Sequence, residues 1–592
     1  MTRAVRIGNC SGFYGDRIAA AREMVDGGPI DVLTGDYLAE LTMLILWKAR
    51  QKDPEAGYAK TFLTQMEHVL GTCLDRGIRV VSNAGGLNPA GLATRLGELA
   101  ARLGLAPRIA YVHGDDLVHR VDELVRDGHD LSNLDTGVPL AEAGVEPVSA
   151  NAYLGGWGIA EALAGDADVV VCGRVTDAAV VTGPAAWWHG WDRGDHDALA
   201  GAVVAGHVIE CGPQATGGNY SWLHEITDRR YPGFPIAEVA ADGSSVITKH
   251  PGTGGLVSVG TVTAQLVYEI AEPAYKGPDV IAHFDTVRLS QEAPDRVRIS
   301  GVRGDPPPPD LKVAVNYLGG YRNTMTLVLT GLDIDDKAAR AEQQLFEILG
   351  GKDRFAEVDT RLIRFDRADA ETNEQACAHL RITVKDPDPK KVGRAFSNAT
   401  MELALGGYAG FHTTTPPTAE SAYGVYWPAL VPASVVEHTV VLPDGTSKVV
   451  EHSPSGPPRT APAPADRTPG PSGPCERAPL GAVCAARSGD KGGNANVGIW
   501  GRDERTYAWL RDFLTTDRLA ELIPEAKGLE VRRYELPDLH ALNFVIVGLL
   551  GAGVASSSRP DPQAKGLGEY LRSRHVDIPT ELLEVARGLQ GK

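Results

Sequence analysis

The chain has 592 residues, a length that predicts two to four domains. Of these residues, 43% are apolar and 23% charged, a composition typical of a globular protein. Its net charge of −18 argues against nucleic acid or an anionic membrane as the main partner. No run approaches the roughly 18 apolar residues of a membrane span, and the first residues lack the apolar core of a secretory signal, so we expect a cytoplasmic location.

The part of the chain from position 1 to 230 alternates short apolar runs with amphipathic patterns. Strands are predicted over 4–7, 30–33, 79–81, 109–112 and 168–172, and helices from residue 18 and over 61–76, 87–103 and 153–164. Apolar strands that alternate with helices indicate βαβ units. We therefore predict an α/β fold with a largely parallel, Rossmann-like sheet that is covered on both faces.

Residues 231–450 predict an accompanying α+β half. Its strands are predicted over 257–268, 312–317, 324–330, 379–384 and 434–441, and its helices over 337–349 and 390–405. Nine prolines between 451 and 479 exclude a continuous helix or sheet and predict a linker over 451–476. Beyond it, an order β-β-α-β-β-α over 482–486, 496–500, 507–522, 529–534, 542–548 and 565–572 predicts an α+β domain in residues 477–592.

Five polar loops each follow a predicted strand: GNCSGFYGDR, TGDYLAE, SNAGGLNP, HGDD and GRVTD. Because ligands bind outside the carboxyl ends of the strands in an open parallel sheet, we expect all five loops at one edge. In SNAGGLNP, Gly85 and Gly86 would let backbone N–H groups approach an anion at the start of a helix, with Asn83 and Asn88 beside them. The alternative is a tight turn in which the two asparagines are local caps.

Charged residues of the same loops are candidates for the chemistry. Asp36, Asp115 and Asp177 are predicted as catalytic acid–base groups or as ligands of a hard cation, and Glu40 would share a helix face with Asp36. Arg174 is predicted to bind a substrate carboxylate. Each has a structural alternative: a helix cap for Asp36, a charge at a helix start for Asp115, and an ion pair between Arg174 and Asp177.

A second Gly-rich loop, ECGPQATGGNY, adds Thr216 and Asn219 as ligand-binding candidates. Cys211 lies in the same loop, but no neighbour in the sequence supplies the base that a nucleophilic thiol needs. The seven cysteines show no C-x-x-C spacing, which argues against a disulfide framework and a zinc site. The chain also lacks a usable G-x-G-x-x-G, a G-x-S-x-G elbow and H-E-x-x-H, so there is no signature for NAD or haem, and metal dependence stays open.

Several long strings resemble a known family. IGNCSGFYGDR, TGDYLAELTM, SNAGGLNP, CGRVTDAA and ECGPQATGGNY, in this order, resemble the AtuA family of acyclic terpene utilisation proteins. RSGDKGGNANVGIW with LPDLHALNFV resembles the small AtuA-like ferredoxin-fold domain, which some members carry at the C-terminus. The resemblance covers about 1–450 and 478–585, and it implies an AtuA-like main domain over 1–450 and a ferredoxin-like domain over 477–592.

The resemblance implies a role in the breakdown of branched acids. The family is tied to bacterial degradation of citronellol- and geraniol-type acids as CoA thioesters, so the implied function is a lyase or hydratase acting on a branched (hydroxy)acyl-CoA or a related anionic acid. The alternative is a non-catalytic binding or assembly subunit of an acyl-CoA carboxylase or dehydrogenase system. In both cases we expect a small-molecule acyl-CoA or carboxylate as the partner, and a homo-oligomer. We also expect the C-terminal domain to dock on the main domain and to close over the ligand edge.

Overall fold

The computed structural model describes residues 3–458 and 468–590, and for Glu40, Leu41, Leu589 and Gln590 it describes the backbone alone. Residues 459–467 of the predicted linker lie outside this description. The chain forms two compact units. Met1–Asn316, Tyr426–Val554 and Asp561–Lys592 make up the first, and Tyr317–Val425 with Ala555–Pro560 the second. Apart from Ala555–Pro560, the C-terminal α+β region thus belongs to the first unit, and the predicted domain boundaries stay predictions.

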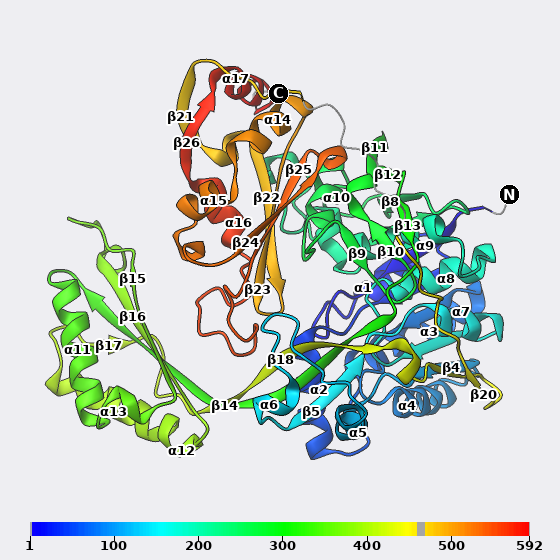
Figure 1. Cartoon of the computed structure of the whole chain (residues 1–592), viewed down its shortest axis with the longest axis horizontal. Coiled ribbons are helices and arrows are strands. Elements are labelled where there is room, and N and C mark those ends of the chain that lie inside the picture. Colours follow the sequence, from blue (N-terminus) through cyan, green and yellow to red (C-terminus); the bar gives the residue numbers. More distant parts are fainter. Residues whose placement is uncertain (1–2, 459–467, 591–592) are drawn as a thin grey trace. The chain divides into compact units, whose positions relative to one another are not determined.

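A sheet of eleven strands runs through the first unit (Figure 1). Its middle consists of five parallel strands in the order β1 (Val5–Asn9), β2 (Val32–Gly35), β3 (Arg79–Ser82), β6 (Val169–Cys172) and β4 (Ile109–His113). These are the five strands predicted from the apolar runs between positions 1 and 230, and β2 and β6 are buried along their whole length. Burial on both faces explains why the runs show no polar alternation.

Antiparallel strands extend this sheet on both sides. Beyond β1 follow β7 (Pro235–Val239), β8 (Ser245–Lys249), β12 (Arg296–Ser300) and β11 (Arg288–Ala293), and beyond β4 follow β19 (Thr439–Val441) and β20 (Ser447–Val449). The sheet is therefore mixed and mostly antiparallel, and the prediction of a largely parallel, Rossmann-like sheet is not confirmed for it as a whole. The flanks differ because short hairpins, which give antiparallel pairs, join several of these strands in place of crossover helices.

Helices cover both faces of the parallel strands. On one face, α1 (Ala20–Asp26), α3 (Lys60–Arg76) and α4 (Pro89–Arg102) share an apolar core with side chains of β2, β3 and β6. On the other, α8 (Ala179–His189) contacts β1, β2 and β3, and it packs between α7 (Trp157–Ala164) and α9 (His196–Ile209). With both faces covered, the ends of the strands remain as places for polar side chains.

One predicted strand, over 257–268, is wrong, because these residues form α10 (Val259–Leu266). Ser258 begins the helix with a capping box. Its hydroxyl accepts a hydrogen bond from the Thr261 N–H at 3.2 Å, and the Thr261 hydroxyl accepts one from the Ser258 N–H at 3.0 Å. These two bonds satisfy N–H groups at the helix start, and they outweigh the strand preference of the valines.

The second unit is a sheet with two helices packed against it (Figure 1). The strands lie in the order β15 (Glu357–Arg364), β16 (Cys377–Asp386), β14 (Asp310–Thr330) and β17 (His412–Thr413), and the helices are α11 (Ile334–Ile348) and α13 (Arg394–Gly406). Leu327, Leu380 and Phe396 belong to its core. The helix predicted over 337–349 is confirmed to within a few residues, whereas the one predicted over 390–405 is divided at Gly393 into α12 (Pro389–Val392) and α13.

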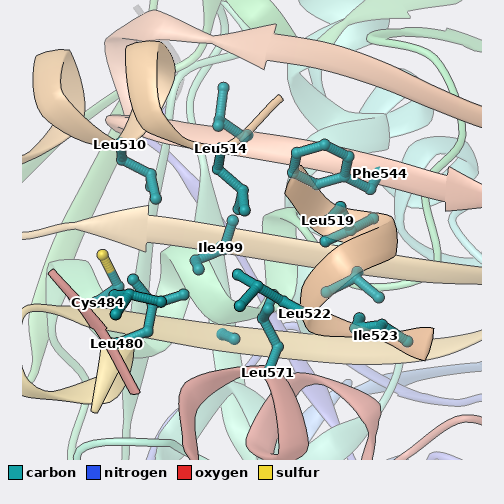
Figure 2. Packing of buried hydrophobic residues seen from close by; sticks show 14 of the residues in the cluster. Leu480, Cys484, Ile499, Leu510, Leu514, Leu519, Leu522, Ile523, Phe544 and Leu571 are labelled. Carbon is teal, nitrogen blue, oxygen red and sulfur yellow. The ribbon is translucent and has the colours of Figure 1, made fainter. Parts of the chain in front are cut away.

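The C-terminal domain has its own core (Figure 2). Its antiparallel strands lie in the order β22 (Cys484–Lys491), β23 (Asn494–Gly501), β25 (Ala541–Ile546) and β24 (Val531–Leu536), and its helices include α14 (Glu504–Phe513), α15 (Thr516–Leu522) and α16 (Leu567–Ser573). The single helix predicted over 507–522 is wrong in one respect, since Thr515 caps a second helix there. Ile499 and Phe544 pack against Leu510, Leu519 and Leu571 of the helices.

The open face of this C-terminal sheet holds residues 267–271, the segment that follows α10. Asn496 accepts the Glu269 N–H at 2.7 Å and donates to the Val267 carbonyl at 3.2 Å. Asn543 donates to the carbonyls of Ile270 and Ala271, at 3.1 and 2.6 Å. The two strings GGNANVGIW and HALNFV therefore contain side chains that bind main-chain groups of the rest of the unit.

A substitution of Gly498 tests the contact between the C-terminal sheet and the segment 267–271. A Cβ at position 498 would lie 2.4 Å from the Val267 Cβ, whereas one at Gly588 would meet nothing within 4 Å. We expect Gly498→Ala to lower the free energy of unfolding by about 1–3 kcal/mol, because the added methyl group overpacks the contact. The matched control Gly588→Ala should leave it unchanged or raise it slightly. Chemical denaturation measures both, and equal stabilities would contradict the contact.

Candidate functional site

The loops after β2 and β3 meet through two buried polar side chains. Asn83 donates to Asp36 Oδ1 at 2.5 Å, and its own Oδ1 accepts the Tyr37 N–H at 2.8 Å. Asn83 is completely buried and Asp36 is only 5% exposed. Burial, together with the negative charge of Asp177, raises the pKa of Asp36 well above its ordinary value. At the carboxyl end of the parallel strands, Asp36 thus keeps its proton to a higher pH than an ordinary aspartate does.

The loop after β6 brings a buried guanidinium to the same place. Arg174 is 3% exposed, forms an ion pair with Asp177 at 2.8 Å, and lies over the Tyr153 ring at 4.2 Å. Its positive charge also acts on Asp36. The structure thus shows the internal ion pair that was the structural alternative for Arg174 and Asp177. The guanidinium is therefore already paired, and Asp177, whose side chain is 30% exposed, is the more accessible partner.

Asp115 follows β4 and contacts the backbone of the loop that carries Arg174. Its Oδ2 accepts the Arg174 N–H at 2.9 Å and the Asn151 side-chain amide at 2.8 Å. Burial raises the pKa of Asp115 to about 7 despite these two hydrogen bonds. Asp115 thus holds the backbone of the Arg174 loop, and its predicted catalytic role stays a prediction.

Packing and capping account for the other residues of SNAGGLNP. A Cβ on Gly85 would lie 2.4 Å from the Cys172 carbonyl oxygen, and one on Gly86, whose φ is +52°, would lie 2.3 Å from the Leu46 Cδ1. Asn88 caps α4, since its Oδ1 accepts the Gly91 N–H at 2.9 Å. The local-cap alternative therefore describes Asn88, and the anion cradle predicted for Gly85, Gly86 and Asn88 stays a prediction.

The two candidates of ECGPQATGGNY differ, since Thr216 is hydrogen-bonded within the protein and Asn219 is exposed. Thr216 is completely buried and donates to the carbonyls of Pro213 and Gly233 at 3.0 and 2.6 Å. Asn219 is exposed and has a φ of +59°, a backbone conformation that asparagine tolerates better than most residues. A role for either in ligand binding stays a prediction. Burial raises the pKa of the Cys211 thiol well above its ordinary value, which argues against a nucleophilic thiolate there.

A His–Glu pair at the end of α9 was missed by the sequence reasoning. His207 Nδ1 lies 3.3 Å from Glu210 Oε1, and His207 Nε2 lies 3.1 Å from the Gln265 carbonyl oxygen. Since a carbonyl can only accept, Nε2 carries a hydrogen, and Nδ1 is the ring nitrogen that faces the Glu210 carboxyl group. The Glu210 Oε2 is buried without a hydrogen-bond partner in the described structure, and burial raises the pKa of Glu210.

The spacing H-x-x-E could have indicated this pair. His207 and Glu210 close a helix whose preceding two turns, LAGAVVAG, are otherwise entirely apolar. Two ionisable groups one turn apart share a helix face. Such a pair on a buried helix has to be satisfied internally or to serve chemistry.

Tyr275 and residues of the C-terminal domain border these acids. Tyr275, in β9 (Ala274–Lys276), stacks on Phe284 with ring centres 5.3 Å apart, and the charges of Glu210 and Asp177 help to raise its pKa well above the ordinary value. From the C-terminal domain, Lys565 pairs with Glu269 at 3.0 Å, and the Lys491 Nζ lies 5.5 Å from the Tyr275 ring centre.

Electrostatic coupling shows that these groups form one cluster. Asp177 raises the pKa of Asp36, Glu210 and Tyr275, and Glu269 raises that of Glu210. The structure therefore brings together Asp36, Asn83, Arg174 and Asp177 from the predicted site and adds His207, Glu210 and Tyr275. We call these seven residues the acid–base cluster. The partners described above for Gly86, Asn88 and Thr216 are other residues than these seven.

Neither a metal site nor a membrane span was found in the part of the chain that the structure describes. Among these residues, no group of three or more His, Cys, Asp or Glu side chains is arranged to hold a metal ion. No described helix is long and apolar enough to cross a membrane.

The fold and the cluster define an α/β protein that gathers acid–base side chains at the carboxyl ends of its parallel strands and has an α+β domain at its C-terminus. The model of the acyclic terpene utilisation family protein AtuA matches residues 5–442, and that of the AtuA ferredoxin-like domain matches 478–577. The chain therefore belongs to the AtuA family and carries the fused ferredoxin-like domain, as its sequence motifs predict. Comparisons with curated proteins and with solved structures gave no match.

Proposed function

We propose that the protein is a catabolic enzyme, a lyase or hydratase that removes water from, or adds it to, a branched hydroxyacyl-CoA or a related carboxylic acid. The observation that carries the proposal is the coexistence of proton-holding and ion-paired carboxyl groups in one cluster. Burial raises the pKa of Asp36 and of Glu210, while Asp177 is paired with a guanidinium and more exposed. Groups with such different environments are suited to act as acid and base in one reaction.

In the dehydration direction, a base removes the proton next to the carbonyl carbon and an acid protonates the leaving hydroxyl group. A carbon–carbon double bond forms as the carbon–oxygen bond breaks, and water leaves. Asp177 is suited to the base role because Arg174 stabilises its charge and its side chain is accessible. Asp36 is suited to the acid role because its buried carboxyl group carries the proton to be donated.

Two properties support a small-molecule substrate of this class. Arg174 and the Lys residues nearby favour an anionic molecule. The chain belongs to a family described by acyclic terpene utilisation, and the resemblance of its motifs implies a branched acid as the substrate.

A panel of 3-hydroxyacyl-CoA thioesters, their enoyl counterparts and the free acids tests the proposal. The formation or loss of the conjugated double bond is followed by absorbance, with and without protein. We expect turnover of at least one branched member, and a bound thioester at 100 times its Kd should raise the free energy of unfolding by about 2.7 kcal/mol. Binding without turnover across the panel would overturn the proposed reaction and favour a binding or assembly role.

A further inference from the structure

We infer that Lys312 and Lys491 form a subsite for an oxyanion group, a carboxylate or a phosphate, of the molecule that the acid–base cluster acts on. The inference rests on the proposed function for the identity of that molecule, but the binding of the anion can be measured separately. It starts from two lysines that differ from the other cations near the cluster.

Lys491 lies at the turn that joins β22 to β23. Its side chain is half-buried, and its Nζ is 5.5 Å from the centre of the Tyr275 ring. Among the described residues, it has no carboxylate within ion-pair distance. Lys565 of the same domain is different, because it pairs with Glu269 at 3.0 Å and with Asp490 at 3.4 Å.

Lys312, in β14, shows the same combination. It is half-buried, and its Nζ lies 5.1 Å from the Tyr153 ring centre and 5.5 Å from that of Tyr426. In the part of the chain that the structure describes, no carboxylate comes within ion-pair distance of this group either. Both ammonium groups thus rest on aromatic rings, which attract cations but do not neutralise them.

The two lysines approach one group of aromatic side chains. A Cβ on Gly492, the neighbour of Lys491, would lie 3.5 Å from the Tyr426 Cε1 and equally close to Asp135 Oδ2, a carboxylate that accepts from the Asn494 amide at 2.8 Å. Tyr153, which Lys312 covers, is also covered by Arg174 at 4.2 Å. The lysines therefore flank the acid–base cluster on its aromatic side.

An external anion is the partner that this arrangement lacks. The chain has 76 acidic and 58 basic residues, so carboxylates are plentiful as partners, yet neither lysine pairs with one among the described residues. Removing an ammonium group from water without a counter-charge is unfavourable, and a bound oxyanion compensates it. Arg174 cannot take this role as readily, since Asp177 already pairs with it.

Calorimetric titration of the full-length protein tests the subsite with two probes. Coenzyme A offers phosphate groups, and succinate offers carboxylates without phosphate. We expect at least one probe to bind at millimolar concentrations or below, and Lys312→Gln and Lys491→Gln each to raise its Kd about tenfold or more, the effect of losing one charge-assisted hydrogen bond. Binding of coenzyme A alone assigns a phosphate to the subsite, and binding of succinate assigns a carboxylate.

Lys448→Gln is the matched control, because Lys448 is exposed and forms an ion pair with Glu161. It should leave the Kd unchanged. The thermal stability of the unliganded Lys312→Gln and Lys491→Gln variants separates binding from structure. Since each substitution removes a cation–π contact but no ion pair between described residues, both variants should melt within about 3 °C of the wild type.

Three results would overturn the inference: no binding of either probe to the wild type, an unchanged Kd in both lysine variants, or a melting temperature of the unliganded variants that is lower than that of the wild type by more than about 3 °C. The proposed function can fail independently. Anion binding that depends on the two lysines, in a protein that turns over no member of the substrate panel, would leave the subsite and reject the reaction. Turnover with an unchanged KM in both lysine variants would leave the proposed reaction and reject the subsite.

Discussion

Asp36→Asn is expected to lower kcat by about 10²–10⁴-fold, the usual effect of losing a general acid, while the protein keeps its fold. The amide has the same shape as the protonated carboxyl group. Its oxygen can still accept from the Asn83 amide, at 2.5 Å in the wild type, and from the Leu38 N–H, at 3.0 Å. What is lost is the transferable proton. Steady-state kinetics and chemical denaturation of the same preparation measure the two effects.

Asp444→Asn is the matched control for this substitution. Asp444 lies in the turn between β19 and β20, where it accepts the Thr446 N–H at 2.9 Å, and an asparagine can do the same. Its kcat should equal that of the wild type. The wild-type kcat should also fall as the pH rises through the raised pKa of Asp36, because only the protonated group can donate. An Asp36→Asn variant with wild-type kcat would remove Asp36 from the mechanism.

Asp115→Asn is expected to make the protein more stable at neutral and alkaline pH. The pKa of Asp115 is about 7 in the folded protein, against a usual value of 3.8. The folded state therefore binds more protons than the unfolded state between these values, and the wild type loses stability as the pH rises from about 4 to about 7. The loss amounts to about 4 kcal/mol above this range, since one pKa unit corresponds to about 1.4 kcal/mol.

The asparagine avoids this loss because it never ionises, and its oxygen can accept from the Arg174 N–H and the Asn151 amide as Asp115 does. The difference in unfolding free energy between variant and wild type should be small at pH 4, grow with pH, and level off above about pH 7. Denaturant titrations over this range measure it. A difference that does not depend on pH, or one that favours the wild type at high pH, would contradict a buried Asp115 with a raised pKa.

Much of the candidate site could be predicted because it depends on local pattern and on one rule of topology. Short apolar runs that end in polar residues identified the five parallel strands, and the carboxyl ends of parallel strands meet at one edge. Asp36, Asn83 and Arg174 follow three neighbouring strands, and the structure brings them together. The antiparallel flanks of the sheet were not predicted, because β7 pairs with β1 and β19 pairs with β4, strands that lie far earlier in the chain.

The motifs of the two AtuA regions were likewise sufficient to recognise the family, since their order and spacing are written in the chain itself. The motifs alone did not show what their residues do in the folded protein. Gly85 and Gly86 were interpreted as room for a ligand, which stays a prediction, and the structure adds that a Cβ at these positions would meet the Cys172 carbonyl or Leu46. The sequence determines that a side chain is missing at these positions, and only the tertiary structure decides what occupies the space.

The acids of the cluster could likewise be predicted from the sequence, whereas the positions of the cations around them depend on the tertiary structure. Asp36 and Asp177 were predictable, and His207 with Glu210 could have been, because a loop position or a helical spacing marks them. The position of Lys491 over Tyr275, and of Lys312 over Tyr153, could not be predicted, because each contact joins segments that are far apart along the chain. Burial and the charges of such distant neighbours also raise the pKa of Asp36, so its protonation is a property of the folded chain.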